Sequence, residues 1–231
     1  MRVALKITSL LLSYPDAEMK REAGNLIKVV EDDQSITDTA RTALIRLLKQ
    51  FEERDLMDLQ ERYVFLFDRT RTLSLHLFEH VHGESRERGQ ALVDLMATYE
   101  RAGFYIDTEE LPDFLPLFLE FLSQAPEDEA KDFLSQIAHI LTALQERLKK
   151  RGSAYQNAFI ALLSLARAKP EAALVRELLD RPEHDPDDLE ALDNVWEEEA
   201  VTFGGGAGEN ACGPDRIDRR MRAHMRDPRN P

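Results

Sequence analysis

The chain has 231 residues, enough for one sizeable helical core or one core with a tail. Its formal net charge of −14 argues against general nucleic-acid binding and against adsorption to anionic lipid, because both need surplus lysine and arginine. The single cysteine, Cys212, excludes an intrachain disulfide and a cysteine-based zinc cluster. No stretch approaches the roughly 20 apolar residues that span a bilayer. No signal-peptide cleavage site follows the first apolar run, so a cytoplasmic location without membrane insertion is expected.

The first two-fifths of the chain has the apolar spacing of amphipathic helices. The N-terminal apolar run predicts a helix that ends before Pro15. Apolar residues at helical spacing predict further helices over 40–51, 56–67 and 92–99, the last of them ended by Gly103. Alternating β-branched runs with hairpin turns do not occur. We therefore expect an all-α fold, with a single compact, bundle-like domain of several helices.

The most regular helical pattern extends from about Pro126 to Arg151. Acidic residues occupy its first turn and basic residues its last, as the helix dipole favours. Gly152 is expected to end this helix. Ser153 and Gln156 then have the spacing of a capping box at the start of another helix.

The character of the chain changes towards its C-terminal end. Residues 1–168 make up the predicted helical domain, and 169–203 an acidic extension with a C-terminal helix. Residues 204–231 read as a Gly-rich joint followed by a basic, disordered tail. A phosphate-binding loop is not predicted in this joint, because Pro214 and Asp215 stand where lysine and serine or threonine are required.

Three histidines close together in sequence raise the possibility of a metal site. His76 and His80 could share one face of a helix, with His82 nearby, which would suit a zinc-dependent hydrolase. However, Glu79 does not occupy the position of the glutamate in the metalloprotease pattern His-Glu-x-x-His. The alternative is a helix end whose imidazoles bond to neighbouring groups. We favour that alternative and expect no metal, no cofactor and no catalysis.

Two segments differ from ordinary amphipathic helices. Residues 61–90 are dense in aromatic and charged side chains, and residues 110–122 are apolar nearly all round. Such a segment either lies in the core or leaves one apolar face exposed as a groove. Core packing is the simpler interpretation for most of these side chains. A groove lined by a few of them would accept an amphipathic helix, and acidic residues at its rim would favour a basic one.

The motifs in these segments resemble a known family. They are FDRTRTLSL at 67–75, LFEHVHGESRERGQALVDL at 77–95 and ELPD at 110–113, with ALDNVWEEE at 191–199. They are similar to those of the NarJ-type assembly chaperones of respiratory nitrate reductase, part of the TorD-like group of all-α chaperones for molybdenum enzymes. The resemblance spans about residues 3 to 203. One departure is Phe114, which stands where the wider group often has histidine.

The resemblance implies a cytoplasmic, non-catalytic chaperone. Such a protein binds the N-terminal segment of the catalytic molybdenum subunit of a nitrate reductase, and it holds that subunit for molybdenum cofactor insertion before membrane assembly. The client could instead be a related selenate, chlorate or tetrathionate reductase. A constitutive subunit that stays in a membrane enzyme is a further alternative.

Within the two segments we predict a set of peptide-binding residues. The predicted apolar anchors are Tyr63, Phe67, Phe114, Leu117, Phe118 and Phe121. The predicted polar contacts are Asp68, Glu79, His80, His82, Glu84, Arg86, Glu110 and Asp113. The arginines expected to fix the helix junction are Arg69, Arg71, Arg86 and Arg88.

Overall fold

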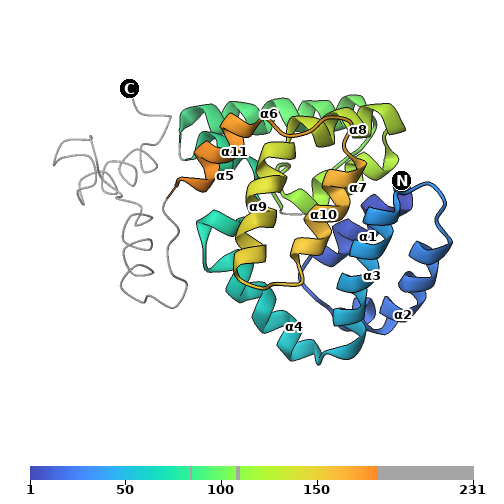
Figure 1. Ribbon diagram of the computed structural model, residues 1–231. Coiled ribbons are helices and arrows are strands. Elements are labelled where there is room, and N and C mark those ends of the chain that lie inside the picture. The colour runs from blue at the N-terminus through green and yellow to red at the C-terminus, as the bar shows by residue number, and fades with distance from the viewer. Residues whose placement is uncertain (84, 108–109, 182–231) are drawn as a thin grey trace, which may run out of the picture. The chain divides into compact units, whose positions relative to one another are not determined.

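The structure, a computed structural model, describes residues 1–83, 85–107 and 110–181 (Figure 1). Within these ranges it contains eleven α-helices, one π-helix and one 3₁₀-helix, and its only extended pairing is an isolated bridge between His76 and Phe114. The predicted all-α fold is confirmed. The predicted acidic helix, the Gly-rich joint and the basic tail lie outside the described residues, so the domain boundaries remain predictions.

The helices follow one another with short connections. Their bounds are α1 Arg2–Leu12, α2 Ala17–Asp32, α3 Asp38–Glu53, α4 Leu56–Tyr63, π-helix η1 Val64–Asp68, 3₁₀-helix η2 Arg71–Leu73, α5 Leu77–His82, α6 Arg86–Arg101, α7 Leu115–Gln124, α8 Glu127–Gln136, α9 Ala138–Lys150, α10 Gln156–Leu165 and α11 Ala172–Leu179. The predicted end of the first helix before Pro15 is confirmed. Gly103, with a φ of 76°, follows the end of α6 in the left-handed conformation that glycine adopts readily.

Side-chain caps start three of the first four helices. Asp16 accepts a hydrogen bond from the backbone N–H of Met19 at 2.7 Å at the start of α2, and Thr37 one from that of Ala40 at 3.1 Å at the start of α3. Asp55 caps α4 in the same way. Each cap satisfies an N–H group that lacks a partner within its helix, and such a cap contributes about 1 kcal/mol.

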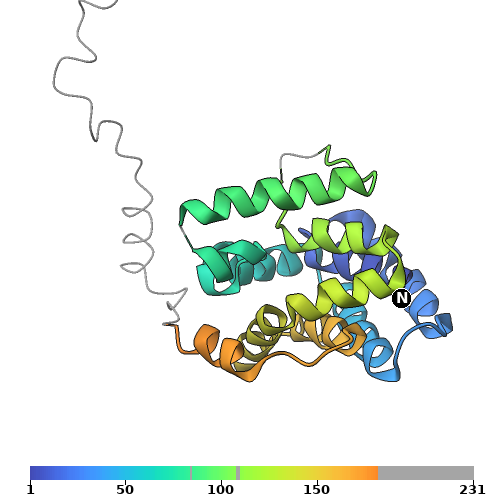
Figure 2. The same ribbon diagram turned by 90° about the horizontal axis from the view of Figure 1, so that it is seen from above.

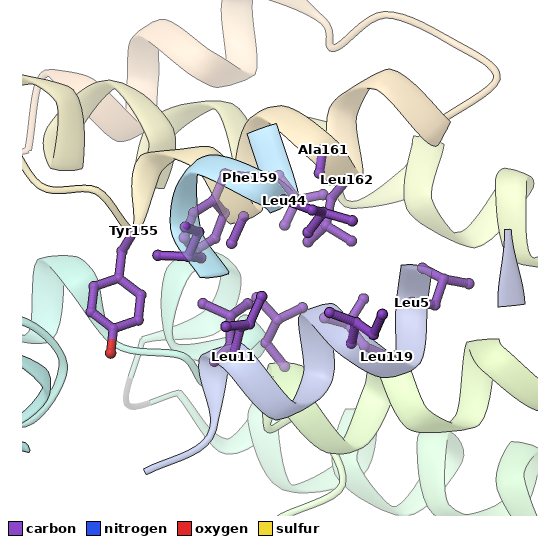
Figure 3. Packing of buried hydrophobic residues seen from close by; sticks show 14 of the residues in the cluster. Leu5, Leu11, Leu44, Leu119, Tyr155, Phe159, Ala161 and Leu162 are labelled. Atoms are coloured by element: carbon purple, nitrogen blue, oxygen red, sulfur yellow. The ribbon is translucent and has the colours of Figure 1, made fainter. Parts of the chain in front are cut away.

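The hydrophobic core lies where α1, α3, α7 and α10 meet (Figure 3). Leu5 and Leu11 of α1 and Leu119 of α7 lie on one side of the cluster, facing Leu44 of α3 and Phe159 of α10. All five side chains are buried. Burial of each such side chain contributes roughly 1.5–3 kcal/mol relative to leaving it exposed.

A buried arginine connects three elements on the other side of α10. Arg147 of α9 donates hydrogen bonds to the carbonyl oxygen of Thr72 in η2 at 2.7 Å and to that of Leu178 in α11 at 2.5 Å. Hydrogen bonds from a charged donor are stronger than neutral ones. They hold η2 and α11 against α9.

Helix α6 forms an outer layer of the described domain (Figure 2). Among the α6 side chains that the structure describes, Tyr99 alone is fully buried. Its ring lies 4.6 Å from that of Phe121 in α7, and its hydroxyl donates to the carbonyl oxygen of Pro112 at 2.7 Å. This residue therefore ties α6 to the segment that leads into α7.

Two local predictions were wrong. The helix expected from Pro126 to Arg151 is divided at Ile137, whose φ of −94° and ψ of 4° leave the helical region. The change of direction allows α8 to pack on α7 and α10 while α9 packs on α10 and α11. The expected capping box of the next helix does not form either. Ser153 Oγ accepts from the N–H of Tyr155 at 3.3 Å, and α10 begins at Gln156.

Candidate functional site

A groove of about 560 Å³ lies where α1 ends beside α7. We call it the α1/α7 groove. Its lining is Ser9, Ser13, Tyr14, Tyr63, Asp68, His76, Glu110, Phe114, Pro116, Leu117 and Glu120. Five of the fourteen predicted peptide-binding residues therefore lie in one groove, although they come from two segments that are more than forty residues apart in sequence.

Helices α1 and α7 are held together by polar contacts along one side of the groove. Ser9 donates a hydrogen bond from Oγ to the carbonyl oxygen of Pro116 at 2.7 Å, and Lys6 forms an ion pair with Glu120. Pro116 lies in the first turn of α7, where the N–H that proline lacks would have no helical partner. The groove wall on this side is thus fixed by direct contacts between the two helices.

The opposite wall depends on Asp113, which is completely buried. Its Oδ2 accepts a hydrogen bond from the N–H of Phe78 at 3.0 Å, and its Oδ1 lies 3.3 Å from Nδ1 of His76. Arg88 of α6 lies 4.0 Å from Asp113 and 3.1 Å from Glu79. Asp113 and Glu79, both predicted to contact a peptide, are therefore engaged within the protein. Arg88 thus connects α6 with α5 and with the segment that leads into α7.

His76 lines the groove, and its pKa depends on its buried partner Asp113. The hydrogen bond that the His76 ring donates to Asp113 raises the pKa of His76 above its ordinary value, against the opposing effect of burial. The His76 ring also lies 5.3 Å from the ring of Phe114, the residue with which its backbone forms the isolated bridge. These contacts fix Phe114 at the rim, where it is half-buried.

Two carboxylates at the rim have no ion-pair partner among the described residues. Asp68 ends η1 and Glu110 precedes α7, and both are exposed. Partial burial raises the pKa of Asp68. Burial raises the pKa of the Tyr63 hydroxyl, and the charges of Asp68 and Glu110 add to that rise. The groove can therefore attract a positively charged ligand.

Apolar surface lies between these charges. Tyr14 is 54% exposed, and its ring meets that of Tyr63 edge-on at 5.6 Å. Phe114 and Leu117 are half-buried on the α7 side. Together these side chains provide apolar surface in the same groove that Asp68 and Glu110 line, which would suit the apolar face of a helix.

Four of the predicted apolar anchors are buried in the core and do not form an exposed surface. Tyr63 donates from its hydroxyl to the carbonyl oxygen of Leu12 at 2.9 Å, and Phe67 packs against Tyr63 at 5.0 Å between ring centres. Phe118 and Phe121 of α7 are 3% exposed and pack among other rings. Core packing thus accounts for these four side chains, although Tyr63 also reaches the groove.

The two histidines of α5, His80 and His82, contact different groups within the protein. His80 is buried, its Nε2 lies 2.8 Å from the carbonyl oxygen of Ser74, and burial lowers its pKa. His82 packs edge-on against Phe78 at 5.7 Å. In the part of the chain that the structure describes, no group of three histidine, cysteine, aspartate or glutamate side chains is placed to hold a metal ion. Glu84 and the side chain of Arg86 lie outside the described set.

Sequence reasoning missed the contribution of α1 to the groove. Ser9 of α1 and the next residues after that helix, Ser13 and Tyr14, line it, and Glu120 lines it from α7. A usable signal was Tyr14 directly before Pro15, because tyrosine is enriched at binding interfaces and this one follows the predicted end of a helix. None of the described helices is long and apolar enough to cross a bilayer.

Comparison with known proteins gives a consistent result. The family model for the nitrate reductase delta subunit matches residues 31–161. The chain is 42% identical over 224 residues to the nitrate reductase molybdenum cofactor assembly chaperone NarJ of Escherichia coli strain K12, covering 97% of this chain and 92% of that protein. It is 45% identical over 202 residues to NarW of the same strain, named for the same role, covering 86% and 83%. A crystal structure assigned as a redox enzyme maturation protein, from Archaeoglobus fulgidus, has the same fold with a TM-score of 0.52 at 24% identity, over 70% of this chain and 91% of that one.

Proposed function

This chain belongs to the nitrate reductase delta subunit family, and we propose that it is a molybdenum cofactor assembly chaperone that holds the N-terminal segment of a nitrate reductase catalytic subunit in the α1/α7 groove. The chaperone role follows from relatives of that name that match most of the chain. The binding of an N-terminal segment rests on the groove itself. We also place this activity in the cytoplasm, before the client reaches a membrane.

The observation that carries the binding proposal is a groove whose lining combines exposed or half-buried apolar side chains with two carboxylates. Tyr14, Phe114 and Leu117 offer hydrophobic contact, and Asp68 and Glu110 offer charge. The ligand that fits is an amphipathic helix with one apolar face and basic residues beside it, bound in the helix-in-groove manner. Its apolar side chains would be buried against this apolar surface while its basic residues pair with the rim.

The hydroxyl groups of the groove support binding rather than catalysis. Ser13 donates from Oγ to the carbonyl oxygen of Ser9 at 2.9 Å, and Ser9 donates to Pro116. His76 faces Asp113 through Nδ1. A nucleophilic serine needs a base within hydrogen-bond reach, and both hydroxyls instead donate to backbone carbonyls. We therefore infer that the chain acts by holding its client.

The test is a calorimetric titration with a peptide copied from the N-terminus of the nitrate reductase catalytic subunit that is encoded with this protein. We expect saturable binding at one site and a loss of at least about tenfold when the apolar face of the peptide is replaced by polar residues. The variant Leu117→Ala should weaken binding several-fold. Val93→Ala, which shortens an exposed side chain on α6, is the matched control.

Two results would contradict the proposal. One is the absence of binding to the folded protein. The other is binding that Leu117→Ala and Val93→Ala leave equally strong, since the peptide would then lie elsewhere. Titration with the corresponding peptide of a selenate or chlorate reductase would identify the client, because the correct peptide should bind more tightly.

A further inference from the structure

A second cavity, of about 260 Å³, is lined by Phe65 and Leu66 of η1, the π-helix whose last residue, Asp68, lines the α1/α7 groove. It is enclosed by the end of α3, by α4, by η1 and by the connection between α9 and α10. Three arginines line it, Arg54, Arg62 and Arg151, and no carboxylate of the described residues does so. In a chain with a net charge of −14, this is a local reversal of charge.

The ordinary explanation of basic residues here is the helix dipole. Arg54 is the C-cap of α3, Arg151 is the C-cap of α9, and Arg62 lies in the last turn of α4, where positive charge is favourable. That explanation accounts for one arginine at each helix end. It does not require the three guanidinium groups to line one cavity. Gln50 accepts a hydrogen bond from Nε of Arg54 at 2.8 Å, which fixes that side chain at the wall.

A buried hydroxyl provides an independent indication of a ligand. Tyr155 lines the same cavity and is 4% exposed, yet its hydroxyl makes no hydrogen bond in the structure. The ring packs edge-on against Phe67 at 5.1 Å and Phe51 at 6.2 Å, and in Figure 3 the hydroxyl points away from the packed cluster of Leu44 and Phe159. Leaving a buried hydroxyl unpaired costs free energy that a ligand could recover.

The protonation of Tyr155 suits donation to an anion. Burial raises the pKa of this hydroxyl well above its ordinary value, so it stays protonated at neutral pH. It can therefore donate one hydrogen bond to an oxygen atom placed in the cavity.

We propose that this cavity binds the phosphoryl group of a small molecule, with Arg54, Arg62 and Arg151 around the anion, the Tyr155 hydroxyl as a further donor and the apolar part of the ligand against Phe51. A phosphate monoester carries close to two negative charges and three terminal oxygens, which match several guanidinium groups better than a carboxylate with one charge does. The inference is independent of the client peptide, because none of these five residues lines the α1/α7 groove.

The first experiment compares phenyl phosphate with benzoate, which share a ring and differ in the anion, and with inorganic phosphate, which has no ring. Phenyl phosphate, benzoate and inorganic phosphate are titrated into the full chain by calorimetry in phosphate-free buffer, and thermal unfolding is followed in parallel. We expect phenyl phosphate to bind with 1:1 stoichiometry and at least about tenfold more tightly than benzoate. Inorganic phosphate, which lacks the apolar part, should bind more weakly than phenyl phosphate. Failure of phenyl phosphate to bind the folded protein at millimolar concentration would overturn the proposal.

The second experiment locates the site. Arg54→Gln and Arg62→Gln should each weaken phenyl phosphate binding by about tenfold, while Arg46→Gln, an exposed position on the same α3 helix, should leave it unchanged. Equal effects of all three substitutions would mean that binding is a nonspecific response to surface charge, and would refute the site.

Tyr155→Phe separates a ligand-binding role from a structural one. The substitution keeps the ring and removes the unpaired hydroxyl, so the ligand-free protein should unfold at an unchanged or higher temperature. Binding of phenyl phosphate should weaken by several-fold at the same time. A variant that unfolds at a lower temperature and binds as tightly as the wild type would show that the hydroxyl serves the fold and not a ligand.

Discussion

Replacing Asp68 by asparagine and Glu110 by glutamine removes both unpaired carboxylates from the rim of the α1/α7 groove with little change in size. Both side chains are exposed, so each ion pair with a basic client residue should contribute about 0.2–1 kcal/mol. The pair together should contribute about 0.4–2 kcal/mol. The double variant should therefore bind the client peptide roughly two- to thirtyfold more weakly than the wild type.

The assay is calorimetric titration at two salt concentrations and at a pH slightly above neutral. That pH keeps Asp68 ionised although partial burial raises its pKa. Because salt screens exposed charges, wild-type affinity should fall between roughly 0.05 M and 0.5 M salt, whereas the double variant should change less. Glu31→Gln removes an exposed charge from α2 and is the control. An affinity and a salt dependence equal to those of the wild type would refute the assignment of both carboxylates to the peptide site.

Three further predictions concern stability. Asp113→Asn should lower the free energy of unfolding by about 1–3 kcal/mol in a urea titration, since it removes the buried charge that faces His76 and Arg88. The pKa of His76 is raised in the folded state above 6.5, so its protonated form stabilises the fold below that value and the contribution is lost as pH rises through the folded-state pKa. The difference in unfolding free energy between wild type and His76→Asn should thus be larger near about pH 5.5 than near about pH 8.5, and a difference independent of pH would contradict this. Leu119→Ala should cost about 2–5 kcal/mol by opening a cavity in the four-helix core, and a change below about 1 kcal/mol in thermal or urea unfolding would show that the site collapses freely.

Helix positions could be predicted from sequence because each depends on local pattern. The stop before Pro15 and the end of α6 at Gly103 follow from backbone chemistry that acts within a few residues. The break at Ile137 could not be predicted in this way. The apolar stripe continues across it, and the change of direction goes with contacts to α7 made by α8 and to α11 made by α9, while both helices pack on α10.

The candidate site was only partly predictable for a similar reason. Apolar density identified the segments that contain Phe114 and Leu117, but it could not separate these half-buried side chains from their fully buried neighbours Phe118 and Phe121. The complete burial of Asp113 was equally hidden, because carboxylates are rarely buried without partners and those partners come from α5 and α6. The contribution of α1 to the groove could not be predicted either, because it depends on the contact of Ser9 with Pro116, which is more than one hundred residues away in sequence.

The π-helix η1 allows a very short stretch of chain to face in two directions. The N–H of Arg69 bonds to the carbonyl oxygen of Val64 at 3.2 Å, five residues back, so this turn is wider than an α-turn. In an α-helix, residues three apart lie on the same side. In η1, however, Phe65 lines the second cavity, with its three arginines, and Asp68 lines the α1/α7 groove. Deletion of one residue here would tighten the turn and rotate everything after it by about 100°. We therefore expect the fold to tolerate a substitution within η1 better than the insertion or deletion of a residue there.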